Sequence, residues 1–199
     1  QYILSVGRLL ADHGHENVTL YTQQSVHTIR DRAWPAYRIQ TDADIAAQVQ
    51  SVLVVEKPHG AYIHHVSSPD LIELLASRLP AVAYVHGFTA VCPGLGKYFH
   101  RGDTVCKRPF GWGCAPMNYV RRCSAARNPR TFYRLMRNTA ALKQALLKLP
   151  RFLVGSRYMR ALLVQNGFPA GRITVLPPHF LPDGVSPAYT PPGEPGSIL

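Results

Sequence analysis

The residues best suited to chemistry are concentrated in residues 86–114, which read HGFTAVCPGLGKYFHRGDTVCKRPFGWGC. This stretch holds two His and three of the chain's four Cys. The gaps in Cys92-x13-Cys106-x7-Cys114-x8-Cys123 are long, whereas zinc ligands usually come in pairs about two to four residues apart. The spacing therefore disfavours a metal centre. A structural zinc on these four Cys is the weaker alternative to packed thiols or transient disulfides.

His86 is the strongest candidate for a functional side chain. It follows AVAYV, a run apolar on both faces, as in a buried strand of a parallel sheet. In open α/β sheets, ligands bind outside the carboxyl ends of the strands, and an imidazole there could position a hydroxyl or contact a phosphate. Gly87 allows the backbone to turn or approach a ligand closely. The alternative is a His hydrogen-bonded inside the domain.

Two further strand ends carry polar residues. His64 and His65 follow one strand and alternate across it, so at most one can face a ligand, and a structural role is favoured for both. Ser156 and Arg157 lie at a strand-to-helix turn, where free backbone N–H groups could hold an anion. An N-cap role explains Ser156 more simply.

Hydrophobic periodicity places these residues in an alternating α/β pattern. Strands are predicted at 17–22, 61–66, 81–88, 151–156 and 172–178, and helices at 1–16, 41–57, 67–79, 130–149 and 157–168. A capping box of Thr41 and Asp44 is predicted to start the second helix, and Ser68 to cap the third. Residues 23–39 and the Cys-rich segment are predicted to be irregular. The alternation predicts a Rossmann-like, doubly wound parallel sheet.

The net charge of +11 is unevenly distributed. Residues 97–151 contain thirteen Lys or Arg and a single acid, Asp103, whereas the remainder is nearly neutral. A block of one sign indicates an anionic partner such as phospholipid, a phosphorylated substrate or nucleic acid. The alternative is an ordinary solvated face.

No run approaches the length of a membrane span and the start is not a signal peptide, so we expect a cytoplasmic protein with reduced thiols. The chain starts without Met, at a helix with no preceding strand, and stops where an apolar run begins. We therefore expect a fragment of a longer protein. Glycine-rich dinucleotide, P-loop and serine-hydrolase motifs are absent from these 199 residues.

Three segments resemble glycosyltransferase family 4, whose GT-B architecture has two facing Rossmann-like domains. YILSVGRLLADHGHENVTLYT is similar to the family's first helix and second strand. VHGFTAVCP…GDTVC…GC resembles its HD(Y/F)…CP segment, and FLVGSRYMRALLVQNGFPAGRITVLPPHF resembles its final N-terminal segment. The resemblance spans residues 2–180. Gly87 and PPH at 177–179 depart from the family's usual Asp and PNG.

The resemblance implies the acceptor-side half of a retaining glycosyltransferase, with domain 1–180 lacking its first strand and carrying a basic Cys-rich insertion at about 89–128. Residues 181–199 would be a linker and the start of an absent donor-binding domain. No cofactor is expected in this chain, because the nucleotide-sugar donor would bind mainly that absent domain. The acceptor would be a glycan or lipid-linked molecule, such as a cell-envelope precursor, at the inner face of a membrane, and no nucleic acid is expected.

The resemblance also assigns roles to single residues. His86 corresponds to the family's His near the cleft, which orients the acceptor or the donor sugar and is not a covalent nucleophile. The predicted acceptor-binding residues are Gly87, Phe88, His65, Ser156 and Arg157. The rival hypothesis is a basic module that binds RNA or anionic lipid without catalysis, because aromatic residues are interleaved with the basic block.

Overall fold

The computed structural model describes residues 2–21, 34–40, 43–64 and 67–177, and it divides the chain into two compact units. The described residues of the first unit are 2–17, and the second unit comprises residues 18–177. The first contains helix α1 (Tyr2–Asp12), as predicted, and the Asn17 side chain donates to the Gly7 carbonyl at 2.9 Å. No helix in the described part of the chain combines the length and hydropathy needed to cross a bilayer.

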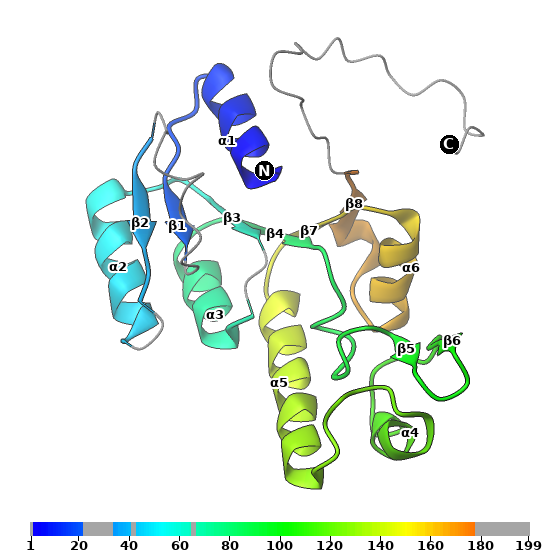
Figure 1. Ribbon diagram of the computed structural model, residues 1–199. Helices are drawn as coiled ribbons and strands as arrows, with labels where there is room; N and C mark the ends of the chain where they lie inside the picture. Colours follow the sequence, from blue (N-terminus) through cyan, green and yellow to red (C-terminus); the bar gives the residue numbers. More distant parts are fainter. Residues whose placement is uncertain (1, 22–33, 41–42, 65–66, 178–199) are drawn as a thin grey trace, which may run out of the picture. The chain divides into compact units, whose positions relative to one another are not determined.

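The second unit is built on a four-stranded parallel sheet in the order β3-β4-β7-β8 (Figure 1). Its strands are β3 (Ala61–His64), β4 (Ala81–Val85), β7 (Arg151–Val154) and β8 (Ile173–Val175). The connecting helices are α3 (Pro69–Arg78), α5 (Pro129–Leu147) and α6 (Arg157–Gln165). All these elements were predicted, with bounds shifted by a few residues.

Strand register separates the sheet into two unlike faces. Ile63, Ala83, Phe152 and Ile173 form one row across the four strands, and all are buried. They belong to the main core together with apolar residues of α3, α5 and α6. The next row contains His64, Tyr84, Leu153 and Thr174 on the opposite face, and of these only Tyr84 is buried.

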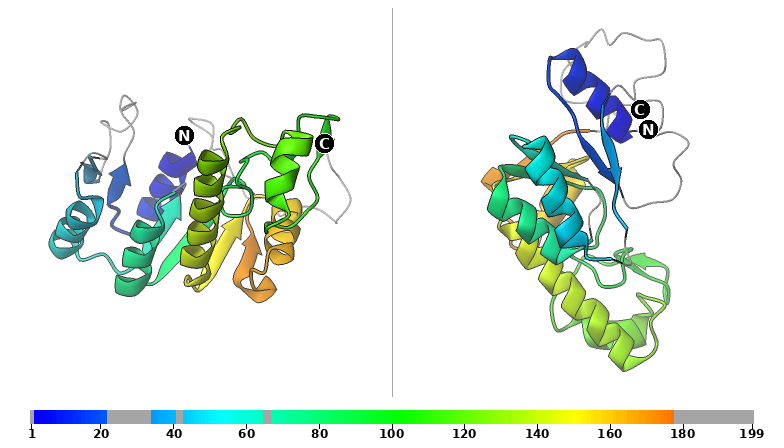
Figure 2. Two further views of the ribbon diagram at one scale, coloured as in Figure 1. Left: turned by 90° about the horizontal axis from the view of Figure 1, so that it is seen from below. Right: turned by 90° about the vertical axis from the view of Figure 1, so that its left-hand side faces the viewer.

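Helices α3 and α5 pack side by side against the sheet (Figure 2). Ser68 caps α3 by accepting from the Leu71 N–H, and Pro69 occupies the first helical position, as predicted. At the far end of α5, Lys148 pairs with Glu73 of α3 at 2.9 Å. Both partners are largely exposed, so this ion pair adds little to stability.

Two predictions outside the main sheet need correction. Asp44 is the N-cap of α2 (Ile45–Glu56) and accepts from the Ala47 N–H, so it is not the third residue of a capping box, and Thr41 lies outside the described residues. Strand β2 (Ala36–Arg38) was predicted as irregular, yet it pairs in parallel with β1 (Thr19–Tyr21). Pro35 immediately precedes β2 and makes the strand difficult to recognise from the sequence. Its carbonyl nevertheless accepts a hydrogen bond from the Thr19 N–H.

The residues between β4 and α5 form an excursion from the sheet, called here the Cys-rich excursion (residues 89–128). It contains a short antiparallel hairpin, β5 (Tyr98–Phe99) with β6 (Thr104–Val105), and helix α4 (Cys114–Arg121). The prediction that the Cys-rich segment is wholly irregular is therefore wrong. The two strands have two residues each and α4 has no side-chain N-cap bond, so their sequence signals are weak.

The structure confirms a mixed α/β fold with a parallel sheet compatible with a Rossmann-like arrangement. In a doubly wound sheet the order of the strands reverses at a switch point. Among the described strands, the order in the main sheet follows the sequence and shows no such reversal. The doubly wound order, and the assignment to one half of a GT-B enzyme, remain predictions.

Candidate functional site

A cluster of aromatic and imidazole rings lies at the carboxyl edge of the main sheet. His86 directly follows β4, a strand with neighbours on both sides, and its side chain is exposed. Its Nε2 hydrogen-bonds with Nε2 of His64, the last residue of β3, and the ring centroids are 4.0 Å apart. One imidazole must donate and the other accept, so their tautomers are complementary.

Tyr84 packs against the His86 ring of this pair. Its ring stacks on His86 with centroids 4.1 Å apart, because residues two apart in a strand share a face. The phenol reaches beyond β7 and donates to the Leu176 carbonyl at 2.7 Å. With 3% exposure, Tyr84 is a rigid platform on which the imidazoles are held. Such a ring pair can exchange a proton or hydrogen-bond a hydroxyl or phosphate.

The other residues predicted on these two strands have different outcomes. His65 lies outside the described residues; it is His64, for which a structural role was favoured, that contacts His86. A Cβ placed on Gly87 meets no described atom within 4 Å, and its φ is not left-handed, so glycine is not sterically required there. Phe88 is partly buried and packs against the main core.

Ser156 and Arg157 lie at the same edge, after β7. Val154 pairs with Val85, so the end of β7 is level with the end of β4. The Ser156 hydroxyl accepts from the Met159 N–H at 3.1 Å, which confirms the N-cap explanation. Both side chains are exposed. The structure brings both residues to the same edge of the sheet as His86.

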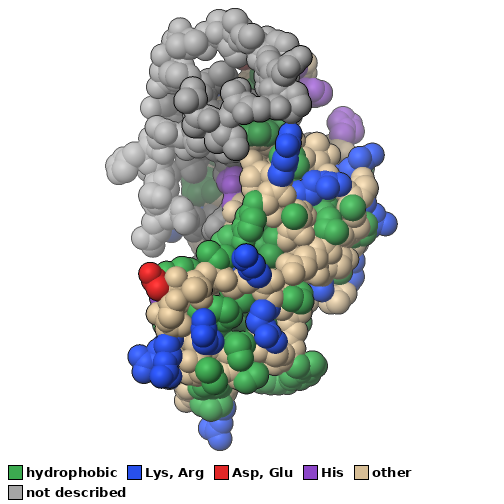
Figure 3. Space-filling model, turned by 90° about the vertical axis from the view of Figure 1, so that its right-hand side faces the viewer, with side chains coloured by type: hydrophobic (Ala, Val, Ile, Leu, Met, Phe, Trp, Pro, Cys, Tyr) green, Lys and Arg blue, Asp and Glu red, His purple; other side chains and the backbone are tan. Residues whose placement is uncertain are grey.

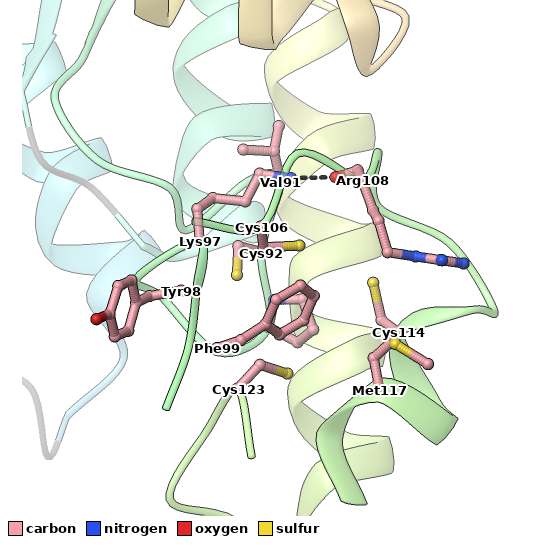
Figure 4. Close-up of a pocket in the computed structure, with 11 residues that line it drawn as sticks. Val91, Cys92, Lys97, Tyr98, Phe99, Cys106, Arg108, Cys114, Met117 and Cys123 are labelled. Carbon is pink, nitrogen blue, oxygen red and sulfur yellow. Dashed lines mark hydrogen bonds between the residues drawn. The ribbon is translucent and has the colours of Figure 1, made fainter. Parts of the chain in front are cut away.

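The four Cys, far apart in sequence, line one small cavity inside the Cys-rich excursion (Figure 4). All four are free thiols; Cys114 is half-buried and the others are buried. The cavity encloses about 20 Å³, which is room for about one water-sized group. Its other walls include Lys97, Phe99, Arg108 and Met117. Among the described residues, no group of three or more His, Cys, Asp or Glu is arranged to hold a metal ion as it stands.

Two of the four thiols, Cys114 and Cys123, have raised pKa values. Burial raises the pKa of the Cys123 thiol to about 11, and the neighbouring Cys92, Cys114 and Cys106 contribute to the same increase. Burial also raises the pKa of Cys114, with Cys92 and Cys106 adding to the increase and Lys97 opposing it.

Buried amides anchor the Cys-rich excursion. Asn118 is fully buried; it donates to the Ala126 carbonyl at 2.7 Å and accepts from the Ser124 hydroxyl at 2.7 Å. Asn166, at the end of α6, accepts from the Phe110 N–H at 2.7 Å. Sequence reasoning missed both residues, because a lone Asn carries no signal that distinguishes a buried anchor from a surface turn.

Gly94 is where the excursion's backbone passes closest to itself. A Cβ at this position lies 2.3 Å from the Cys123 carbonyl oxygen, which is backbone and cannot rotate away. We expect Gly94→Ala to lower the free energy of unfolding by about 1–3 kcal/mol, measured by urea denaturation. Gly111→Ala is the matched control, because a Cβ there meets nothing within 4 Å. Equal stability of both variants would contradict the close approach.

Comparisons with protein-family models, with curated proteins and with solved structures found no match to this chain. The assignment of function therefore depends on the sequence resemblance and on the geometry of the site.

Proposed function

We propose that the protein is a glycosyltransferase that moves a sugar from a nucleotide-sugar donor to a glycan or lipid-linked acceptor with retention of configuration, and that this chain supplies the acceptor side. The observation that carries the proposal is the position of His86. It is exposed at the carboxyl end of an interior strand and contacts His64 and Tyr84. Ligands bind at this edge in parallel α/β sheets.

The neighbouring elements suit an acceptor. A sugar hydroxyl can hydrogen-bond with an imidazole, and the exposed Ser156 and Arg157 at the start of α6 offer polar groups for the remainder of the acceptor or for a phosphate. The proposed roles are orientation of the acceptor or donor sugar by His86 and acceptor binding by Gly87, Phe88, His65, Ser156 and Arg157. His64 is added because it contacts His86.

The direct test is sugar transfer by the complete gene product. The purified protein is incubated with a panel of labelled nucleotide sugars and with lipid extracts as acceptors, and the product's anomeric configuration is determined by NMR. We expect label in an acceptor with the donor's configuration. Inversion would contradict retention, and the absence of transfer from every donor would contradict the proposed class.

A second candidate function is binding to an anionic membrane surface. The face in Figure 3 carries blue Lys and Arg side chains among exposed apolar ones in green. The exposed apolar residues of the Cys-rich excursion and α5 include Trp112, at 84% exposure, together with Tyr119, Val120 and Tyr133. Cations beside aromatic and aliphatic side chains are the combination that binds anionic lipid headgroups.

Vesicle flotation tests this second function. We expect the protein to float with anionic vesicles at low salt and to dissociate as salt screens the charges. Reversal of three exposed cations on α5, Arg130→Glu/Arg134→Glu/Arg137→Glu, should weaken binding by at least about 100-fold.

The matched control reverses the same charge elsewhere in the unit, as Arg38→Glu/Lys57→Glu/Arg78→Glu, and these residues are also exposed. Equal loss in both variants would show that only net charge matters. Binding to RNA in preference to vesicles would contradict the membrane assignment.

A further inference from the structure

The Cys-rich excursion has little apolar core with which to hold its shape. Apart from Ala90, Val91 and the partly buried Phe88 beside it, which join the main core, its own apolar cluster within the described residues consists of Phe99, Cys106, Cys123 and Met117. Segments of about 40 residues usually need disulfides or metals to be stable, because they bury too little surface. No disulfide is formed here.

Strained backbone conformations lower the stability of the Cys-rich excursion further. Left-handed φ angles occur at four non-glycine residues of the excursion: Leu95, Lys97, Asp103 and Arg122. Such conformations cost free energy and persist only where the surroundings impose them. The hairpin strands have two residues each and helix α4 has eight, so regular secondary structure accounts for little of this backbone. Besides the buried anchors Asn118 and Asn166, we therefore expect a further group to hold the excursion together.

The buried Lys97 indicates that a negatively charged group belongs near the cavity. Its side chain is only 3% exposed, and Nζ donates to the Arg108 carbonyl. Among the described residues no acidic side chain forms an ion pair with Lys97, which lines the cavity that the four Cys share. Figure 4 shows its stem running beside Cys92 and Cys106. A buried cation without a counter-charge is costly, so a nearby anionic group is expected.

We propose that Cys92, Cys106, Cys114 and Cys123 bind one structural Zn²⁺ ion in this cavity. Four thiolates are a preferred ligand set for structural zinc. Four thiolates around Zn²⁺ carry net negative charge, part of which the buried Lys97 compensates. Binding releases the four thiol protons to solvent.

In the proposed site, the ion would draw the four thiolates toward a common point in the cavity. The four sulfurs share one cavity but do not stand in ligand geometry, so zinc binding requires their side chains to reorient. The ligands come from four places: the turn after β4, the segment after β6, the start of α4 and the segment after α4. One ion would therefore cross-link these four segments of the Cys-rich excursion. This inference does not depend on the proposed transferase activity.

The first test is metal content and cobalt spectroscopy of the unmodified protein. Purified protein should contain stoichiometric zinc by mass spectrometry. After removal of zinc and addition of Co²⁺, the absorption bands of tetrahedral cobalt thiolate should appear and then disappear on titration with Zn²⁺. Iron in place of zinc, a disulfide, or four reactive thiols in protein refolded with zinc would each overturn the proposal.

Variants separate ligands from neighbours. Cys114→Ser, at the most exposed of the four, should lose zinc, whereas Met117→Leu, which lines the same cavity, should retain it. Lys97→Met keeps the apolar stem and removes the charge, and should weaken zinc affinity by about 10- to 100-fold. If Cys114→Ser does not fold, the cobalt titration of unmodified protein still decides. Retention of full zinc affinity by Cys114→Ser would remove Cys114 from the site and overturn the four-Cys assignment.

Discussion

In the complete gene product, His86→Ala is expected to lower the rate of sugar transfer by about 100-fold or more, while the free energy of unfolding changes little. The side chain is exposed, so its removal leaves no cavity in the core. It does remove the imidazole that contacts His64 and stacks on Tyr84 at the proposed acceptor edge. The measurements are steady-state kinetics of transfer and urea denaturation of the same preparation.

Two further variants sharpen this test. His86→Gln keeps a hydrogen-bonding amide but cannot exchange a proton, so partial recovery would assign an orienting role and no recovery a proton-transfer role. His59→Ala is the matched control, because His59 is an exposed histidine preceding β3, at the opposite edge of the sheet. Transfer kinetics of His86→Ala equal to those of the unmodified protein would remove His86 from the site.

Phe152→Ala is expected to cause the largest loss of stability, about 3–5 kcal/mol. Phe152 is fully buried in β7 and meets the ring of Phe168 edge to face, with centroids 5.2 Å apart. Because domains of this size are stable by only about 5–15 kcal/mol, much of the total would be lost. Urea denaturation measures the change.

The control for Phe152 is Tyr133→Ala, which removes an aromatic ring that is 56% exposed on α5. Its effect should stay within about 0.5 kcal/mol. Adding Phe168→Ala to Phe152→Ala should cost less than the sum of the two single changes, because the rings share one contact. A loss below about 1 kcal/mol for Phe152→Ala would contradict the packing of the main core.

The strands and helices of the main sheet were predictable because local chemistry determines them. Ser68 and Pro69 mark the start of α3, and the short apolar runs around Ile63, Ala83 and Phe152 mark buried strands. Strand β2 and helix α4 were not predictable, since neither has a strong periodic or capping signal. Their pairing and packing partners stabilise them.

The candidate site was predictable only in part. His86 follows from the rule that ligands bind beyond the carboxyl ends of parallel strands. Tyr84 could also have been found, because residues two apart in a strand share a face. The contact with His64 could not, since it depends on the register between β3 and β4, which joins residues 22 positions apart.

The sequence by itself determined the α/β class, the main strands and helices, and the position of His86, because periodicity, capping residues and strand ends are local properties. Only the tertiary structure decided that four widely spaced Cys share one cavity with a buried Lys97. Sequence spacing measures distance along the chain, and it disfavoured a metal site because zinc ligands are usually recognised as close pairs. Here the folding of the Cys-rich excursion, through the close approach of Gly94 to Cys123 and the anchoring by Asn118, brings distant residues together.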